Sequence, residues 1–155
     1  MKALLTLSIV VFSYSLQAQE IEVIKLPQLK EMMAAKNDHT VFFNFWASWC
    51  GPCVKEMPYL QQVDGTNNLE VVLISLDFSQ DIEKTRRILE KKEIELKTYL
   101  LDETDYDKVI PAINKSWSGA IPATLVIRKN GERFFYEKGF EKEELEDIVQ
   151  QHTTK

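Results

Sequence analysis

The sequence predicts an α/β protein in which a mixed central sheet is flanked by helices on both faces. Two observations carry this prediction. Apolar, strand-like runs alternate with helical segments along most of the 155 residues, which is the pattern of parallel strand–helix–strand units. Toward the C-terminal end, two strand-like runs flank Asn130 and Gly131, a strong hairpin signal that adds an antiparallel edge. The length fits one compact domain.

The first half of the chain begins with an expected strand over residues 21–26 and a helix over residues 28–35. Residues 40–46 form a nearly continuous apolar run, which is typical of a strand buried on both faces. A helix is expected from residue 51 to about residue 63, because Pro52 would stand in its first turn, where proline is tolerated.

The second half adds an expected helix–strand element in the middle of the domain. Ser79 is a candidate N-cap, and Thr104 with Asp107 resembles a capping box. The last helix has an acidic first turn, which suits the helix dipole. The expected elements are a buried strand at 69–76, a helix at 79–92, a strand at 96–101, a short helix from 104 toward 117, hairpin strands at 123–129 and 132–138, and a helix at 141–151.

Residues 1–18 read as a secretory signal peptide, with residues 19–155 forming the mature domain. Lys2 gives a positive start, a charge-free and mostly apolar stretch follows, and Ala18 is a small residue suited to cleavage. The alternative is an uncleaved membrane anchor, but the stretch is shorter and more polar than a spanning helix needs. No cysteine lies near the cut, which excludes a lipoprotein anchor. We therefore expect a periplasmic or secreted protein.

Composition limits the function classes. The formal charge is −5, and no cluster of lysine and arginine stands out, so no nucleic-acid partner is expected. Hydrophobic residues make up 45% of the chain, enough to build a core without disulfide staples. The only two cysteines, Cys50 and Cys53, must therefore serve another purpose.

Cys50 and Cys53 stand where a buried strand gives way to a helix N-terminus. Unpaired N–H groups and the positive end of the helix dipole there stabilise the thiolate that attacks disulfides. We expect Cys50, at the helix tip and exposed, to be the nucleophile, and Cys53, one turn deeper, to resolve the mixed disulfide. Gly51 and Pro52 shape the turn, and Trp49 presents an apolar surface beside the reactive sulfur.

Two other interpretations of the cysteine pair are weaker. A structural disulfide across so short a loop would constrain the unfolded chain little. Half of a zinc site would need further cysteine or histidine ligands, and only His39 and His152 exist. No metal and no small-molecule cofactor are therefore expected.

The segment from Phe43 to Pro58 resembles the active-site segment of TlpA/ResA-type periplasmic thioredoxins, and the segment from Gly119 to Thr124 resembles their second signature. The resemblance spans about residues 40–150 and implies a thioredoxin fold with an added mid-domain helix and strand. Asn44 stands six residues before the first cysteine, where cytoplasmic thioredoxins carry a buried aspartate.

The resemblance also assigns a role to Glu56, three residues after the second cysteine, as the group that handles protons near the thiols. A half-buried carboxylate there would titrate jointly with a thiol. The alternative is an ordinary surface glutamate. Pro122 resembles the family's cis-proline, which would leave the backbone of Ile121 free to pair with a substrate peptide. The alternative is a trans proline that begins an edge strand.

These features predict a reductase of disulfides in cysteine-containing extracytoplasmic proteins. It would take electrons from a membrane thiol–disulfide donor, and cytochrome c maturation is one role in this family. The Gly-Pro dipeptide indicates a potential of roughly −270 mV, as in thioredoxin. Alternatives are a disulfide oxidase or isomerase, then a copper-binding assembly factor, which would need a wider cysteine spacing and a dedicated histidine. A peroxidase ranks low, because the hallmark around a peroxidatic cysteine is missing.

Overall fold

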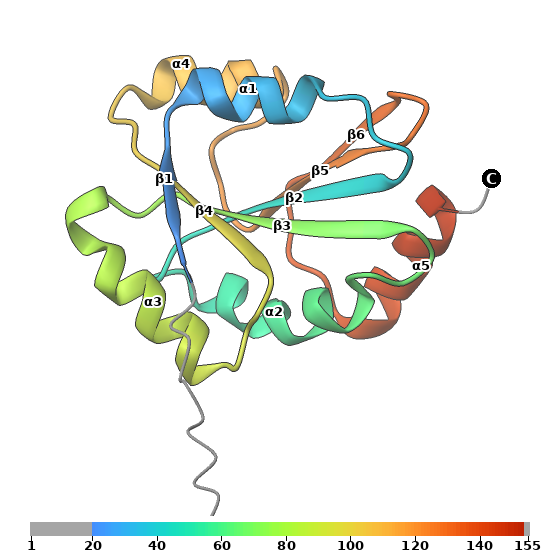
Figure 1. Cartoon of the computed structure of the whole chain (residues 1–155), viewed down its shortest axis with the longest axis horizontal. Helices are drawn as coiled ribbons and strands as arrows, with labels where there is room; N and C mark the ends of the chain where they lie inside the picture. Colours follow the sequence, from blue (N-terminus) through green and yellow to red (C-terminus); the bar gives the residue numbers. More distant parts are fainter. Residues whose placement is uncertain (1–19, 154–155) are drawn as a thin grey trace, which may run out of the picture.

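The computed structural model describes residues 20–153, which form a six-stranded sheet between two layers of helices (Figure 1). The signal-peptide prediction falls outside the described residues. The strand order is β1-β4-β3-β2-β5-β6. Strands β1 (Glu22–Ile24), β4 (Lys97–Leu101), β3 (Leu69–Ser75) and β2 (Thr40–Trp46) run parallel, and β5 (Ala123–Ile127) and β6 (Arg133–Tyr136) add the antiparallel side. The predicted mixed sheet is confirmed.

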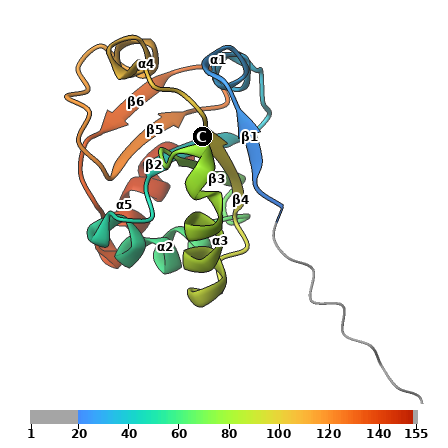
Figure 2. The same cartoon turned by 90° about the vertical axis from the view of Figure 1, so that its left-hand side faces the viewer.

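Helices cover both faces of the sheet, as Figures 1 and 2 show from two directions. Helices α1 (Leu26–Ala34) and α4 (Tyr106–Ile113) lie on one face. Helices α2 (Gly51–Val63), α3 (Ile82–Lys91) and α5 (Lys142–Thr153) lie on the other. Two separate apolar cores result, one on each side of the sheet.

Strand β2 joins the two cores. All seven of its residues are buried, which confirms the expectation drawn from its apolar run. Phe42 and Trp46 point into the core under α2 and α5, and Phe43 and Phe45 point into the core under α1 and α4. Because side chains alternate along a strand, Asn44 lies on the same face as Phe42 and Trp46. A polar residue in the central strand therefore faces α2.

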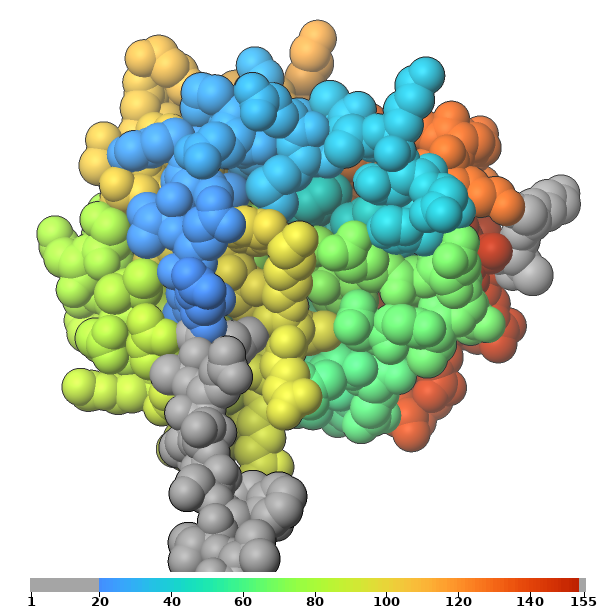
Figure 3. Space-filling model, in the orientation of Figure 1, coloured from blue at the N-terminus to red at the C-terminus, as the bar shows by residue number. Residues whose placement is uncertain are grey.

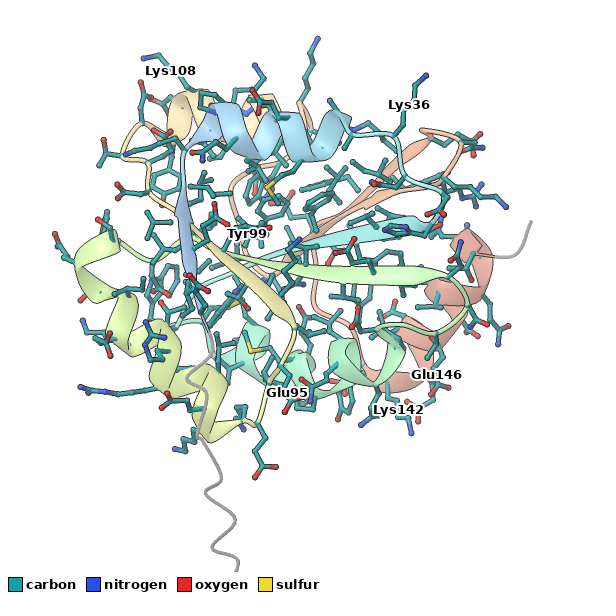
Figure 4. The ribbon with its side chains drawn as sticks, in the orientation of Figure 1. Lys36, Glu95, Tyr99, Lys108, Lys142 and Glu146 are labelled. Carbon is teal, nitrogen blue, oxygen red and sulfur yellow. A yellow bond between two sulfur atoms is a disulfide. The ribbon has the colours of Figure 1, made fainter. Side chains whose placement is uncertain are left out.

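The added mid-domain element is present. A 3-10 turn over Ser79–Asp81, helix α3 and strand β4 follow β3, and β4 inserts between β3 and β1. Figure 3 shows the yellow β4 segment beside the blue β1 at the surface. In Figure 4, the long charged side chains of Lys36 and Lys108 point away from the body of the protein, and Lys142 lies near Glu146 on α5.

Three local predictions are wrong. Ser79 does not cap α3, because Asp81 N–H bonds back to the Phe78 carbonyl at 2.8 Å and a 3-10 turn takes up the first residues. Thr104 does not open α4, whose N-cap is Asp105 with its carboxylate paired to Lys108.

The third wrong prediction is the two-residue hairpin turn. Arg128 N–H donates to the Glu132 carbonyl at 2.9 Å, so three residues form the loop. Gly131 takes the left-handed conformation, with φ of 86°, that such a three-residue loop requires.

His152 near the end of α5 is buried at the sheet end opposite the cysteines. Arg128 Nε–H donates to His152 Nδ1 at 3.1 Å, so the ring proton lies on Nε2, 2.6 Å from Tyr136 Oη. Burial, aided by the nearby Arg128 charge, lowers the pKa of His152 to about 4. The unfolded chain therefore binds a proton between about pH 6.5 and pH 4 that the folded chain does not.

We expect His152 to make the folded protein less stable as the pH falls from 6.5 toward 4. The contribution of the ring is fully present above pH 6.5, and protonation of the unfolded state removes about 1–3 kcal/mol of it by pH 4. Denaturant unfolding of the wild type and of His152→Gln at pH 7 and pH 4.5 measures this. The stability advantage of the wild type over the variant should shrink at the lower pH, and an equal advantage at both pH values would contradict the assignment.

Candidate active site

The cysteine pair lies at the junction between β2 and α2. Strand β2 ends at Trp46, and a tight turn follows in which Cys50 N–H donates to the Ala47 carbonyl at 3.0 Å. Cys50 is the N-cap of α2, and Pro52 occupies the first turn. Because β2 runs parallel to β3, the junction lies at the end of the sheet where β3 also ends. In Figure 1, this end is toward the left of the view, where α3 begins, and Figure 2 faces this side of the molecule. The predicted strand–helix context is confirmed.

Cys50 and Cys53 form a disulfide, with an S–S distance of 2.04 Å. Cys53 N–H points at Cys50 Sγ from 3.3 Å, so the helix N-terminus directs a donor at this sulfur. Cys50 is 5% exposed and Cys53 is 0% exposed. The expectation of an exposed Cys50 is therefore wrong for the disulfide form, because Cys53 and the loop at Ile121 cover most of it. The expected order of accessibility still holds.

Trp49 precedes the pair and is 73% exposed, which makes it the most exposed large apolar side chain of residues 20–153. It presents the apolar surface expected beside the reactive sulfur. Trp117 behaves differently. It packs against Phe45 and Phe135, and its indole N–H donates to the Ala120 carbonyl at 2.8 Å, so it is a core residue that also supports the loop before Pro122.

The Ile121–Pro122 peptide bond is cis, as the resemblance implied, and the alternative of a trans proline is wrong. The Ile121 carbonyl oxygen lies 3.8 Å from Cys50 Sγ. Pro122 directly precedes β5, which pairs with β2, so the sheet holds this loop against the cysteine pair. The two signatures, some 70 residues apart in the chain, meet at one point.

Glu56 is a buried carboxylate of α2, 1% exposed. Asn44 Nδ2 donates to Glu56 Oε1 at 2.9 Å, and Phe140 N–H donates to Oε2 at 2.7 Å. Burial raises the pKa of Glu56 to about 7, although these two hydrogen bonds act in the opposite direction. The alternative of a solvated surface glutamate is wrong.

Asn44 is fully buried and connects Glu56 to the sheet. Its Nδ2 also donates to Thr124 Oγ1 on the paired strand β5, at 3.1 Å. Its Oδ1 has no partner among the described residues. The neutral amide therefore supplies one donor to the carboxylate without adding a second buried charge.

Glu56, although buried, lines a hollow between α2 and the loop before α5. This pocket has a volume of about 360 Å³. Its lining residues are Gly51, Pro52, Lys55, Glu56, Gly139, Phe140 and Glu141. Gly139 has no side chain to intrude, and a Cβ there would stand 3.2 Å from Pro122 Cγ and 3.4 Å from Glu56 Oε2. A carboxyl that is buried yet borders such a hollow can exchange its proton with water.

Sequence reasoning missed three contributors to this site. Phe140 supplies a backbone donor to Glu56, and Gly139 leaves room beside it. Asp77 accepts hydrogen bonds from Ser48 in the turn before Cys50. None of the three belongs to a local motif, and each lies more than 25 residues from its partner, so no sequence signal could have found it.

The arrangement can run reversible thiol–disulfide exchange. It combines a disulfide at a helix N-terminus with a buried carboxyl group, three residues after Cys53 on the same helix, whose pKa is near neutral. Within residues 20–153, no group of three histidine, cysteine, aspartate or glutamate side chains is arranged to hold a metal ion.

Comparison with known proteins finds one family model, described as the AhpC/TSA family, which matches residues 11–132. The thiol-disulfide oxidoreductase ResA of Geobacillus kaustophilus is 30% identical over 93 residues, which cover 59% of this chain and 50% of the relative. ResA of Bacillus cereus is 29% identical over 117 residues, covering 73% of this chain and 63% of the relative. The chain thus spans between half and two thirds of the length of these curated relatives.

Solved structures share the fold. A secreted disulfide oxidoreductase of Mycobacterium tuberculosis, described as homologous to E. coli DsbE, aligns with a TM-score of 0.60 at 23% identity and covers 76% of this chain and 85% of its own. A thioredoxin-related protein of Neisseria meningitidis aligns with a TM-score of 0.62 at 24% identity, covering 77% and 88%. The expected thioredoxin fold is confirmed.

Proposed function

The chain belongs to the AhpC/TSA family, and from this premise we propose that it is a thiol–disulfide oxidoreductase that works through Cys50 and Cys53. One observation carries the proposal. The Cys50–Cys53 disulfide lies at the N-terminus of α2, with the cis Ile121–Pro122 bond beside it. The relatives named ResA support the same activity.

In the reducing direction, the Cys50 thiolate attacks a partner disulfide. A mixed disulfide forms between Cys50 and one partner sulfur, and the other partner sulfur leaves as a thiolate that takes up a proton. The Cys53 thiol then gives its proton to the Glu56 carboxylate and attacks Cys50 Sγ. The second partner sulfur leaves as a thiolate and takes up the proton from Glu56. The partner is then a dithiol and this protein keeps the disulfide, so two electrons have passed to the partner.

Partner binding is proposed at Ile121 and Pro122. The Ile121 carbonyl faces Cys50 Sγ at 3.8 Å, so an extended peptide that pairs with this backbone would bring its own cysteine to the reactive sulfur. Trp49, 73% exposed, would add apolar contact on the other side.

The direction of electron flow is proposed to be reducing, because the dipeptide between the cysteines is Gly51-Pro52. Equilibrating the protein with dithiothreitol and glutathione redox buffers measures its potential, which we expect near about −270 mV. A value near about −120 mV, as for a strong oxidant, would contradict the reductase assignment and favour an oxidase or isomerase of secreted proteins.

The proposed setting is the periplasm or the cell exterior. The partners would be cysteine-containing proteins there, including cytochrome c precursors, and a membrane thiol–disulfide protein would supply electrons. The signal-like start of the chain supports this setting. Separately, no helix within residues 20–153 has the length and apolar character needed to cross a membrane. N-terminal sequencing of the exported protein should begin at Gln19, and an intact Met1 would contradict cleavage.

A further inference from the structure

Asp77 is a buried carboxylate that the exchange chemistry does not use. It lies just after β3 and is 4% exposed. Its oxygens accept hydrogen bonds from Ser48 N–H at 2.9 and 3.1 Å and from Ser48 Oγ at 2.9 Å. They also accept from Ser75 Oγ and Thr85 Oγ1, each at 2.8 Å. A buried carboxylate is tolerated only when hydrogen-bonded in this way.

These bonds join three separate parts of the fold. Ser75 is the last residue of β3, and Thr85 belongs to α3 in the added mid-domain element. Ser48 belongs to the turn that leads into Cys50. Figure 2 shows the side of the molecule at which β3, α3 and the start of α2 lie. Asp77 therefore fastens the active-site turn to the end of β3 and to helix α3.

The position of Ser48 bears directly on Cys50. Cys50 N–H closes the turn on the Ala47 carbonyl at 3.0 Å, with Ser48 inside that turn. Cys50 then stands at the N-cap, where its sulfur meets Cys53 N–H at 3.3 Å. In the reduced state this donor and the helix dipole stabilise the thiolate, and both effects fall off within a turn of the helix end. A loosened turn would move the sulfur away from them.

We propose that Asp77 is a positioning residue for Cys50, which holds the turn at Ser48 so that the Cys50 thiolate stays at the N-terminus of α2. This inference rests on the proposed thiol–disulfide function. If Asp77 acts by positioning Cys50, its replacement shifts the pKa of the Cys50 thiol in one direction; if it acts through its negative charge, the shift is in the opposite direction. Loss of position raises the pKa of the Cys50 thiol, whereas loss of a nearby negative charge lowers it.

The test compares Asp77→Ala with Asp77→Asn in the reduced protein. The pKa of the Cys50 thiol is measured from the pH dependence of alkylation, and the exchange rate is measured with a model peptide disulfide. Asp77→Ala should raise the thiol pKa and slow exchange at neutral pH about tenfold. Asp77→Asn keeps an acceptor for the Ser48 amide without the charge, so its thiol pKa should be at or below that of the wild type.

Asp64→Ala is the matched control. Asp64 Oδ1 accepts from Val71 N–H at 2.7 Å, so it also fastens a loop to β3, but at the end of the sheet away from the cysteines. This variant should lose stability and keep the wild-type thiol pKa. If Asp77→Ala does not fold, Ser48→Ala, which removes only the hydroxyl donor, should still raise the thiol pKa by a smaller amount.

Three results would overturn the inference. The first is a folded Asp77→Ala whose thiol pKa equals that of the wild type, and the second is an Asp77→Asn whose thiol pKa and exchange rate are changed as much as those of Asp77→Ala. The third applies if Asp77→Ala is unfolded, and is a Ser48→Ala whose thiol pKa equals that of the wild type. The proposed function fails in a different way. If the wild type exchanges no disulfide with the model peptide, the function is wrong, while the alkylation profile of Cys50 still reports whether Asp77 positions the sulfur.

Discussion

Replacing Cys50 with serine should lower the thiol–disulfide exchange rate by about three orders of magnitude or more, because the attacking thiolate is gone. Replacing Cys53 should have a different effect. Cys50 can still attack a partner, but the second sulfur that would release it is missing, so the mixed disulfide accumulates. The reason to expect this asymmetry is the position of Cys50 at the N-cap of α2, where Cys53 N–H points at its sulfur from 3.3 Å, whereas Cys53 lies inside the helix and is fully buried.

The measurement is the trapping of a peptide that carries a disulfide, read by mass spectrometry and on non-reducing gels. Cys53→Ser should hold one peptide per molecule through Cys50, and Cys50→Ser should hold none. The double variant sets the background, since the chain has no other cysteine. Equal trapping by the two single variants would show that the nucleophile has been assigned wrongly. The Cys53→Ser variant can also be used to capture natural partners from cell extracts for identification.

Replacing Glu56 with glutamine should stabilise the oxidised protein at pH 8 by about 1–3 kcal/mol. The folded-state pKa of Glu56 is about 7, raised from 4.5 by burial, so the folded protein binds a proton more tightly than the unfolded chain does. This tighter proton binding stabilises the folded protein. The stabilisation is fully present below pH 4.5 and is lost as the pH rises through 7. Above pH 7 the wild type keeps a buried charge that glutamine lacks.

The local hydrogen bonds can adapt to glutamine. The amide oxygen can accept from Phe140 N–H. If the Asn44 side chain turns over, the amide N–H₂ can donate to Asn44 Oδ1, which has no partner among residues 20–153 of the wild type. The gain at pH 8 should therefore exceed the loss of hydrogen-bond quality. Near pH 4.5, where the folded wild type is protonated at Glu56, the two proteins should differ little.

Denaturant unfolding of the oxidised proteins at pH 5 and pH 8 measures this difference. Glu146→Gln is the control, because Glu146 is half exposed on the outer side of α5, and it should change stability at neither pH (Figure 4). The pH profile of the resolving step should also lose its inflection near pH 7 in Glu56→Gln. A variant that is less stable than the wild type at pH 8 would rule out a buried, charged Glu56.

Local patterns predicted some elements well and others poorly. The continuous apolar run predicted β2 over residues 40–46, and Pro52 predicted the start of α2, because both signals act within a few residues. The predicted caps at Ser79 and Thr104 were wrong. Asp81 N–H bonds to the Phe78 carbonyl in a 3-10 turn, and Asp105, paired with Lys108, is the N-cap of α4. The hairpin was placed correctly, but its loop is one residue longer, since Asn130-Gly131 fits both loop lengths.

In the candidate site, too, local patterns identified some residues and missed others. Cys50 and Cys53 could be recognised from their spacing and position, and Asn44, Glu56 and Pro122 from a resemblance in two short segments. The partners that give these residues their properties lie far away in the chain. Phe140 is 84 residues from Glu56, and Asp77 is 29 residues from Ser48. Their contacts depend on how the sheet and the loops are assembled.

The sequence by itself indicated the proposed chemistry, because a cysteine pair at a strand-to-helix junction can be identified from the order of a few neighbouring residues. It also determined the alternation of strands and helices, since apolar periodicity is a local property. Only the tertiary structure decided how deeply Glu56 is buried, which donors reach it, and that Asp77 holds the turn before Cys50. Burial sets the pKa of a carboxyl, and burial depends on every element packed around it.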